Sequence, residues 1–367
     1  MIVERRLIKH LDWPLIGALV ALTVIGAATI YSVTWDHVAG EPGREFYTQL
    51  YALPVAFAAL AACLLIDYRS LAQRSLLLYG ALVLALLYVA FFGTIREGAR
   101  RWMLIGGVSL QPSEFARLVI ALVLAAYFGD ARRSARSFGE LALAGILVGV
   151  PAFLILQQPD LGTAATIVPV FVGAAYLAGL RLRWVAAAAL MLVLLSPLIY
   201  NYGLQDYQRA RIDTFLDPSR DPRGGGYQQI QAKITVGSGG FYGKGFLEGT
   251  QGGYGFLPVA HNDFVFSVLA EEHGFLGVLV ALSLYLFVLV RSLDAAKLAR
   301  DRVGALLVVA IISGFAFQVV YNITMSAGLA PVKGLTLPLM SSGGSSLVAT
   351  LAGFGLILNV RMRRFTN

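Results

Sequence analysis

Apolar stretches of about 20 residues, the length that a helix needs to cross a bilayer, recur along the whole chain. Of its 367 residues 57% are hydrophobic and only 14% charged, whereas a soluble domain needs far more charged surface. The pattern predicts an all-α polytopic membrane protein, a single membrane domain over residues 1–367. The ten predicted transmembrane helices are 14–34, 47–66, 75–93, 111–128, 139–157, 161–180, 184–202, 262–291, 303–325 and 342–360.

The first apolar stretch follows a basic segment, MIVERRLIKHLDWP, as in a signal peptide. The run 14–34 is longer than the apolar core of a signal peptide, about 7–15 residues, and many similar runs follow it. We therefore expect a first helix that is retained. The single cysteine, Cys63, excludes a disulfide within the chain, and no Cys/His cluster has the spacing of a metal site.

Basic residues indicate which helix ends face the cytoplasm. With the N-terminus placed there, every short inner segment carries Arg or Lys, together more than half of the 29 basic residues. They are Arg5, Arg6, Lys9, Arg69, Arg74, Arg132, Arg133, Arg136, Arg181, Arg183, Arg291, Lys297, Arg300, Arg302, Arg361, Arg363 and Arg364. The first outer segment carries Asp36, Glu41 and Glu45 against only Arg44. Because the number of predicted helices is even, we expect both termini in the cytoplasm.

Two outer segments break this charge pattern. Segment 94–110 contains three arginines, and segment 203–261, a large extracytoplasmic loop between the seventh and eighth helices, is far too long for a simple connector. Within the second segment, Tyr227, Ile230 and Ile234 recur at helical spacing opposite polar residues. That pattern predicts a short helix at the membrane surface.

Glu114 and Arg117 lie three residues apart in the fourth predicted helix and therefore share a face. An isolated charge inside a membrane is costly, so we expect these side chains to pair with each other or to line a hydrated cavity. A structural ion pair and a polar pocket for a substrate both fit this pattern.

Three arginines precede the same helix: Arg96, Arg100 and Arg101. Pro112 suits its first turn, whose free N–H groups point toward them. A helix N-terminus beside guanidinium groups favours phosphate or pyrophosphate. Contact with anionic lipid headgroups is the simpler alternative.

Ser341 and Ser342 precede the last predicted helix in the stretch LPLMSSGGSS. Their hydroxyls and the glycines that follow suit either a capped turn or a second contact to an anion or a sugar. Asp160, at the start of the sixth helix, stands where an N-cap is expected, and we interpret it as a cap. Lys333 is a further cation on the outer side, where water alone would solvate it.

Asp263 ends the long outer segment and starts the eighth predicted helix, two residues after His261. Glu271 follows on a similar face, about 12 Å deeper. A carboxylate below the membrane surface costs free energy unless it is paired or hydrated, which suggests a functional group. By residue type alone, Asp263 could equally be a helix cap.

Six motifs occur in order: GARRW, QPSEFARL, QPDLGTA, GKGFLEGTQ, FLPVAHNDFVFSVLAEEHGFLG and LPLMSSGGSS. Together they resemble the SEDS family (shape, elongation, division and sporulation), and the GTQ…FLP arrangement resembles its rod-shape branch. The resemblance implies ten helices in the bacterial cytoplasmic (inner) membrane and polymerisation of lipid II into peptidoglycan strands during elongation. It also implies a class B penicillin-binding protein as the transpeptidase partner, and no nucleic acid.

The same resemblance implies roles for individual residues. The family's essential aspartate falls on Asp263, which would be the general base, and Arg117 stands where the family usually has Lys. An acidic residue is common in the family at the position of Val259. The substrate-binding residues that the motifs imply are Arg100, Arg101, Trp102, Glu114, Arg117, Lys244, His261, Ser341 and Ser342, the last of these where the family often has Tyr. No cofactor or metal-ligand set is implied, although a divalent cation such as Mg²⁺ could assist.

Two other functions fit a polar groove inside a membrane. One is a flippase that moves lipid II across the bilayer, and the other is a scaffold that only holds the penicillin-binding protein. Purified protein given lipid II in detergent distinguishes the enzyme from both, because polymerisation there requires neither flipping nor a scaffold.

Overall fold

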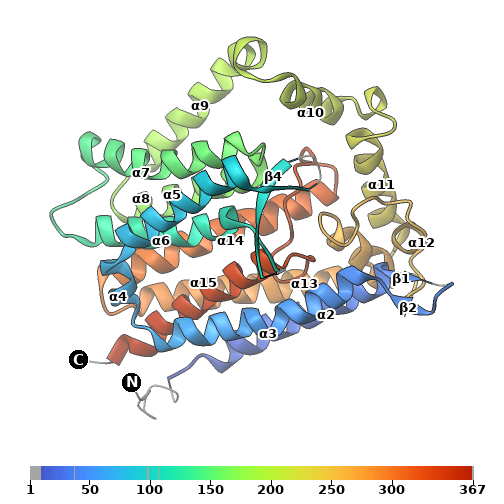
Figure 1. Cartoon of the computed structure of the whole chain (residues 1–367), viewed down its shortest axis with the longest axis horizontal. Helices are drawn as coiled ribbons and strands as arrows, with labels where there is room; N and C mark the ends of the chain where they lie inside the picture. The colour runs from blue at the N-terminus through green and yellow to red at the C-terminus, as the bar shows by residue number, and fades with distance from the viewer. Residues whose placement is uncertain (1–9, 37, 97–98, 107, 366–367) are drawn as a thin grey trace.

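The computed structural model describes residues 10–36, 38–96, 99–106 and 108–365. Long helices run side by side and form a bundle (Figure 1). The first half contains α2 (Trp13–Val33), α3 (Arg44–Leu65), α4 (Tyr68–Gln73), α5 (Ser75–Phe92), α6 (Pro112–Gly129), α7 (Phe138–Gln157), α8 (Leu161–Leu177) and α9 (Leu182–Leu198). The second half contains α10 (Asp206–Leu216), α11 (Gly225–Ser238), α12 (Thr250–Gly253), α13 (Val265–Lys297), α14 (Arg302–Ser326) and α15 (Gly344–Met362). Short helical turns are η1 (Ile199–Gly203), η2 (Pro218–Arg220) and η3 (Arg363–Phe365).

Nine helices within the described residues are long and apolar enough to cross a membrane. A further helix, α8, is apolar but has only 17 residues. Each of the ten predicted segments coincides with one of these helices, which confirms an all-α polytopic membrane protein. The number of ten crossings stays a prediction, because α8 is at the lower limit of the length that spans a bilayer.

Helix α15 lies inside the bundle with nearly all of its residues buried. A Cβ on Gly355 would lie 2.6 Å from the carbonyl oxygen of Leu60, so only glycine lets α15 approach α3 this closely. One turn further along α15, Asn359 Nδ2 donates to the carbonyl oxygens of Cys63 and Ile66 at 2.9 Å and 2.7 Å. These carbonyls belong to the end of α3, where helical partners are missing. Close packing and capping therefore fix α3 on α15.

The start of α2 and the end of α15 meet at one end of the bundle, which we call the terminal end. There the Asp12 carboxylate pairs with Arg291 of α13 at 3.0 Å and with Arg361 of α15 at 2.5 Å. Other basic residues predicted to share one side of the membrane also gather here in ion pairs, namely Arg69 with Asp301 and Arg363 with Asp67. The predicted inner residues Arg5, Arg6 and Lys9 lie outside the described residues.

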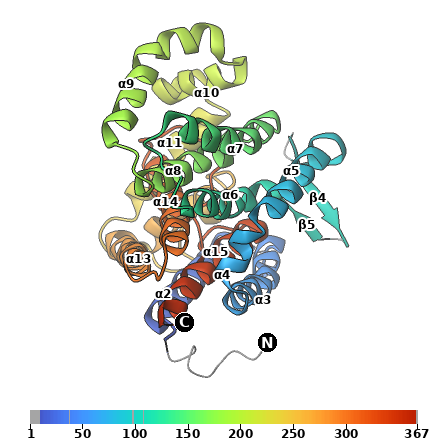
Figure 2. The same ribbon diagram turned by 90° about the vertical axis from the view of Figure 1, so that its left-hand side faces the viewer.

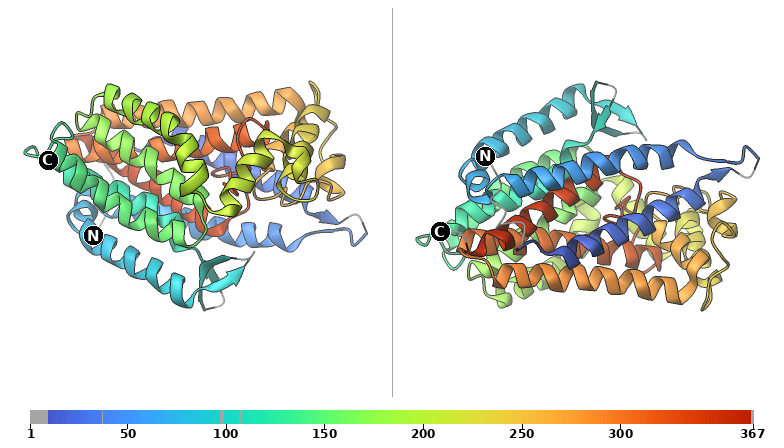
Figure 3. Two further views of the ribbon diagram at one scale, coloured as in Figure 1. Left: turned by 90° about the horizontal axis from the view of Figure 1, so that it is seen from above. Right: turned by 90° about the horizontal axis from the view of Figure 1, so that it is seen from below.

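The opposite end of the bundle, which we call the loop end, carries α11 and α12, as the views from above and below show (Figure 3). Helix α9 stands away from the rest of the bundle (Figure 2) and buries none of its residues, whereas α10 packs against α11. The long segment between the seventh and eighth predicted helices is therefore largely helical rather than an open loop.

The helix predicted around Tyr227 forms as α11. Ile230 and Ile234 are 44% and 48% exposed, as a helix at a membrane surface requires. The opposite face, however, is buried against the protein, because Gln229 donates to the carbonyl oxygen of Gly328 at 3.4 Å. The helix is confirmed, and its place at a membrane surface stays a prediction.

Segment 94–110 folds as a three-stranded antiparallel sheet, which the sequence does not predict. Its strands, β3 (Thr94–Arg96), β4 (Ala99–Ile105) and β5 (Val108–Leu110), pair in chain order. Arg100 stands opposite Ile95, and Leu104 stands opposite Ser109. A second, two-stranded ladder joins β1 (Trp35–Asp36) to β2 (Glu41–Pro42) after α2.

Candidate active site

Asp263 lies in the turn that precedes α13, and its side chain is half-buried. Helix α13 begins at Val265, and Phe264 takes the N-cap position without a side-chain capping bond. Asp263 therefore lies one residue outside the cap. Its backbone N–H donates to the carbonyl oxygen of Val259 at 3.1 Å. Val259 has a φ of 53°, a left-handed conformation that costs an L-residue about 1–2 kcal/mol, so backbone strain is held beside the carboxylate.

Asn322, fully buried in α14, fixes this turn from a neighbouring helix. Its Nδ2 donates to the main-chain carbonyl oxygen of Asp263 at 2.8 Å and to that of Leu335 at 2.7 Å. Leu335 belongs to segment 327–343, which connects α14 to α15. A Cβ on Gly334 would lie 3.6 Å from Oδ2 of Asp263, so this connecting segment passes directly beside the carboxylate.

The serine-glycine turn before α15 closes on the same place. The backbone N–H of Ser342 donates to the carbonyl oxygen of His261 at 2.9 Å. The buried Ser341 hydroxyl accepts a hydrogen bond within its own turn at 2.8 Å, and Gln49 of α3 donates to the Ser341 carbonyl at 3.3 Å. His261, Asp263 and Ser342 therefore come together, whereas Ser341 shapes the turn that holds them.

Two cations lie near this region. Lys333 belongs to the connecting segment that borders Asp263, and its ammonium lies 5.6 Å from the ring centroid of Tyr321. Burial and the positive charge of Arg211 in α10 lower the pKa of Lys333. Neither Lys333 nor Arg211 forms an ion pair within the part of the chain that the structure describes. A bound anion would relieve the repulsion between the two.

Glu114 and Arg117 form the ion pair that their spacing predicts, with 3.5 Å between Arg117 Nη2 and Glu114 Oε2. Arg117 also donates to the hydroxyl of Thr350 in α15 at 2.8 Å and to the side chain of Gln318 in α14. Gln318 donates to the carbonyl oxygen of Thr336 at 3.0 Å. The cavity that adjoins Arg117 holds only about 20 Å³, so the geometry favours the structural ion pair over a substrate pocket.

Asp160 caps α8, as the sequence predicts, with Oδ1 accepting from the N–H of Thr163 at 3.1 Å. Its other oxygen accepts from the side chain of Gln111 at 3.1 Å, and the N–H of Gln111 donates to the Ser345 hydroxyl at 3.0 Å. The N-terminal ends of α6, α8 and α15 therefore meet. Helix N-termini carry partial positive charge, which adds positive potential on this side of the bundle.

Arg100 and Arg101 donate from β4 to carbonyl groups at the ends of two helices. Arg100 Nη1 reaches the carbonyl oxygen of Phe91 in the last turn of α5 at 3.0 Å. Arg101 Nε reaches that of Gln158, just past α7, at 3.0 Å. Cations are favourable at helix C-termini, and five N–H donors on each guanidinium leave others for a ligand. Arg100 is exposed, while Arg101 and Trp102 are half-buried.

Lys244 is paired with Glu271 instead of facing an open site. Its Nζ lies 2.5 Å from Oε1 of Glu271, whose side chain is fully buried in α13. The same carboxylate accepts from the N–H groups of Thr250, Gln251 and Gly252 at 3.0–3.2 Å, which lack helical partners in the first turn of α12. The geometry gives Lys244 and Glu271 a structural role, and the predicted contact of Lys244 with substrate stays without support.

No three His, Cys, Asp or Glu side chains gather at one point within the described residues. Magnesium in proteins is often held by one or two carboxylates together with substrate phosphates and water. Asp263 fits that arrangement as the single carboxylate, with a phosphate-bearing substrate as the other source of ligands.

The chain matches known proteins over almost its whole length. The sequence profile of the FtsW/RodA/SpoVE family, described as a cell cycle protein, matches residues 10–365. The peptidoglycan glycosyltransferase MrdB of Escherichia coli (strain K12) is 34% identical over 355 residues, which cover 97% of this chain and 94% of MrdB. The peptidoglycan glycosyltransferase RodA of Treponema pallidum (strain Nichols) is 29% identical over 428 residues, which cover 97% and 99% of the two chains.

Solved structures have the same fold. A chain from a structure on the coordination of polymerization and crosslinking by a peptidoglycan synthase complex superimposes with a TM-score of 0.84 and 34% identity, covering 97% of this chain and 99% of that chain. The crystal structure of the rod shape determining protein RodA of Thermus thermophilus gives a TM-score of 0.73 and 31% identity, covering 97% and 98%. This chain belongs to the FtsW/RodA/SpoVE family, the SEDS family that its motifs resemble.

Proposed function

We propose that this protein polymerises lipid II into peptidoglycan strands, with Asp263 as the general base. Its relatives are named peptidoglycan glycosyltransferases, and membership of their family gives this chain the same reaction class. One observation carries the finer proposal. Asp263 is a half-buried carboxylate in a turn held by Asn322, and the segment that passes beside it carries Lys333, whose pKa the charge of Arg211 helps to lower. Neither cation has an acidic partner within the described residues.

Lipid II carries a disaccharide on a polyprenyl pyrophosphate. In the proposed step, the C4 hydroxyl oxygen of an acceptor GlcNAc attacks C1 of a donor MurNAc, and the bond from C1 to the pyrophosphate oxygen breaks. The hydroxyl proton passes to the Asp263 carboxylate, and the electron pair of the broken bond leaves with the pyrophosphate. A single displacement of this kind inverts the configuration at C1. Asp263 must then lie within hydrogen-bond reach of the acceptor hydroxyl.

The leaving pyrophosphate gains negative charge as the bond breaks, and fixed cations stabilise such charge best where water is excluded. Lys333 is partly desolvated and immediately precedes Gly334, which lies beside the Asp263 carboxylate. Arg211 adds a second positive charge close enough to lower the pKa of Lys333. These two residues are therefore better placed for the pyrophosphate than Arg101, which is engaged at the end of α7.

We infer that the loop end faces the outside of the bacterial cytoplasmic membrane and that both termini face the cytoplasm. Ion pairs that involve Arg291, Arg361, Arg69 and Arg363 gather at the terminal end, and basic residues of this kind favour the cytoplasmic side. A structural relative belongs to a peptidoglycan synthase complex that coordinates polymerization with crosslinking. By that relationship, we propose a class B penicillin-binding protein as the crosslinking partner of this chain.

Purified protein given lipid II in detergent, with and without the partner, tests this function. Glycan strands should form, because a micelle has no second face for a flippase and a scaffold has no catalytic group of its own. The matched variants are Asp263→Asn and Asp206→Asn, the second an exposed carboxylate of α10 in the same outer segment. The proposal is supported if the Asp206→Asn variant forms glycan strands and the Asp263→Asn variant does not. Lipid II left intact by the wild-type complex would overturn it in favour of the flippase or the scaffold.

A further inference from the structure

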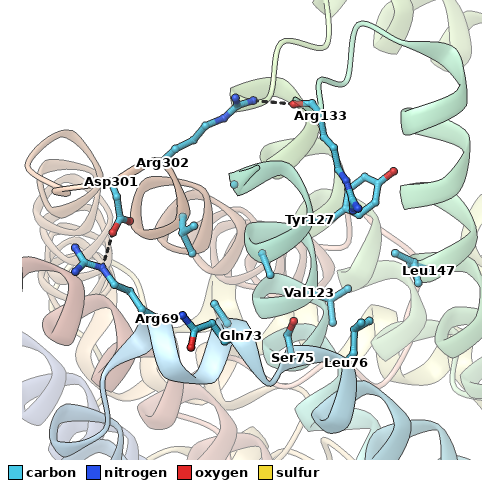
Figure 4. A pocket seen from close by; sticks show the side chains of 14 residues that line it. Arg69, Gln73, Ser75, Leu76, Val123, Tyr127, Arg133, Leu147, Asp301 and Arg302 are labelled. Atoms are coloured by element: carbon cyan, nitrogen blue, oxygen red, sulfur yellow. Dashed lines mark hydrogen bonds and ion pairs between the residues drawn. The ribbon is translucent and has the colours of Figure 1, made fainter. Parts of the chain in front are cut away.

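A cavity of about 500 Å³ opens at the terminal end of the bundle. It lies between α4, α5, α6, α7 and the start of α14 (Figure 4). Asp263 comes before the start of α13 and Asp301 comes after its end, so the 33 residues of that helix separate this cavity from the candidate active site. A volume of this size is typical of a small-molecule site.

Three guanidinium groups and one carboxylate surround the cavity. Arg69 Nε donates to Oδ2 of Asp301 at 2.6 Å, which neutralises that arginine. Arg302 Nη2 donates to the carbonyl oxygen of Arg133 at 3.3 Å, so two further arginines stand on the same rim (Figure 4). The Arg133 guanidinium lies 4.3 Å from the ring centroid of Tyr127. Among the described residues, neither Arg133 nor Arg302 forms an ion pair.

Two carboxylates lie close to Arg133, Asp130 at the end of α6 and Glu140 on α7, and neither lines the cavity or forms an ion pair with Arg133. The Glu140 carboxylate accepts a hydrogen bond from the Tyr127 hydroxyl, and Glu140 does not line the cavity. The net charge of the lining side chains therefore stays positive. An anion held between Arg133 and Arg302 would be their missing partner.

The inner wall of the cavity is apolar. It is built from Leu76 of α5, Val123 of α6 and Leu147 of α7. Leu76 is 68% exposed, so the apolar wall continues onto the outer surface of the bundle. In a chain whose helices cross a membrane, that surface faces acyl chains, while the arginines at the helix ends lie at the level of the headgroups.

We propose that this cavity binds an anionic glycerophospholipid, with the phosphate at Arg133 and Arg302 and an acyl chain against Leu76 and Leu147. Guanidinium groups bind phosphate oxygens in a bidentate manner, and basic pockets between transmembrane helices suit anionic headgroups. A free phosphate ion would satisfy the arginines alone and leave the apolar wall unused. The bound lipid would join α5, the α6–α7 connection and α14 at the membrane surface.

Native mass spectrometry of the purified full-length protein in detergent tests this site. The probes are phosphatidylglycerol and phosphatidylcholine with identical acyl chains. The wild type should retain phosphatidylglycerol in preference, and Arg133→Gln with Arg302→Gln should lower that retention about tenfold, the loss expected for about 1.4 kcal/mol. The control double variant is Arg132→Gln with Arg136→Gln, which removes the same charge from exposed arginines of the same connection that do not line the cavity. Its retention should stay within about twofold of the wild type.

Four results would overturn the proposal. Equal loss in both double variants would indicate general attraction by charge, and equal retention of the two lipids by the wild type would remove the role of the anionic headgroup. Displacement of phosphatidylglycerol by inorganic phosphate at equal concentration would indicate a free-ion site. If the Arg133→Gln, Arg302→Gln variant does not fold, the single variant Arg302→Glu replaces it, because Arg302 is exposed. Unchanged retention of phosphatidylglycerol by Arg302→Glu would also overturn the proposal.

Discussion

The side-chain amide of Asn322 donates a hydrogen bond of 2.8 Å to the main-chain carbonyl oxygen of Asp263. The same nitrogen donates to Leu335 at 2.7 Å, so one buried side chain joins the turn before α13 to the segment before α15. The bond leaves the Asp263 carboxylate itself unengaged by Asn322. Asn322 is therefore a positioning residue for the proposed base.

Replacing Asn322 with Leu should lower the rate of glycan synthesis by a larger factor than it lowers the amount of folded protein. The variant leaves the buried carbonyl oxygens of Asp263 and Leu335 without this donor, which costs about 1–3 kcal/mol for each, and the turn that carries the base loses its anchor. Strand synthesis and thermal unfolding should both be measured. Ser326→Ala is the control, because Ser326 is buried on the same helix and its hydroxyl has no partner in the described structure. A loss of activity no larger than the loss of folded protein would give Asn322 a purely structural role.

Asp263→Asn should fold normally and form almost no glycan. Loss of a general base commonly lowers a rate by about 10² to 10⁴, and Asn preserves the shape and size of the side chain. The measurement is the initial rate of lipid II polymerisation beside a thermal melting curve. A rate within a few-fold of the wild type would remove Asp263 as the base. The Glu271 carboxylate would not replace it, because Lys244 and three backbone donors already saturate that group.

Lys333→Gln combined with Arg211→Gln should weaken lipid II binding by about tenfold or more, because the pyrophosphate would lose two cations that have no carboxylate partner among the described residues. The salt dependence of binding should fall in the same variant. Arg100→Gln with Arg101→Gln is the comparison, since these two arginines donate to helix ends. A larger loss of affinity in the second pair than in the first would move the pyrophosphate site to β4.

Glu271→Gln should be strongly destabilising. The variant leaves Lys244 without its charged partner and places an NH₂ group against the backbone donors at the start of α12, and breaking a buried pair costs about 3–5 kcal/mol. Chemical denaturation of the purified protein measures this. Lys297→Gln, which removes an exposed ion pair with Asp294 at the other end of α13, should change stability by less than about 1 kcal/mol. Similar effects of the two substitutions would contradict the anchoring role of Glu271.

Asp301 should make stability depend on pH. Burial raises the pKa of its carboxyl group, but hydrogen bonds from the Gly304 N–H, Tyr68 and Arg69 outweigh burial and hold the pKa below its ordinary value. A group of this kind stabilises the fold fully above its unfolded pKa, about 3.9, and loses the contribution as pH falls through the folded value. Asp301→Asn retains the cap on α14 but not the charge. The advantage of the wild type in melting temperature should therefore shrink below about pH 4, and a constant difference would contradict the assignment.

The sequence predicts the membrane helices well because each needs only its own apolar run. The Glu114–Arg117 pair can also be predicted from the sequence, since a spacing of three residues places both side chains on one helix face. Contacts between distant segments are different. Lys244 and Glu271 are separated by 27 residues and Asn322 and Asp263 by 59, and nothing local in the sequence indicates that either pair meets.

A weaker signal for Asn322 does exist. Gln318, Asn322 and Ser326 recur every four residues inside an otherwise apolar helix, which places three polar groups on one face. Polar residues inside a membrane helix are expected to face partners, so this stripe indicates the side of α14 that borders the site. The sheet of segment 94–110 lacks such a signal, because Arg100 and Arg101 resemble surface residues until their carbonyl partners are known.

The turn before α13 is fastened through main-chain atoms, since Asn322 bonds to the carbonyl oxygen of Asp263 and the Ser342 N–H bonds to that of His261. Every amino acid has a carbonyl oxygen, so these two fastenings do not depend on which side chains stand at positions 261 and 263. The two hydrogen bonds thus hold the backbone of the turn, while the side chains at positions 261 and 263 are free to differ. Other acids, amides or imidazoles could be installed there to change the chemistry of the site, while the backbone that presents them stays in place.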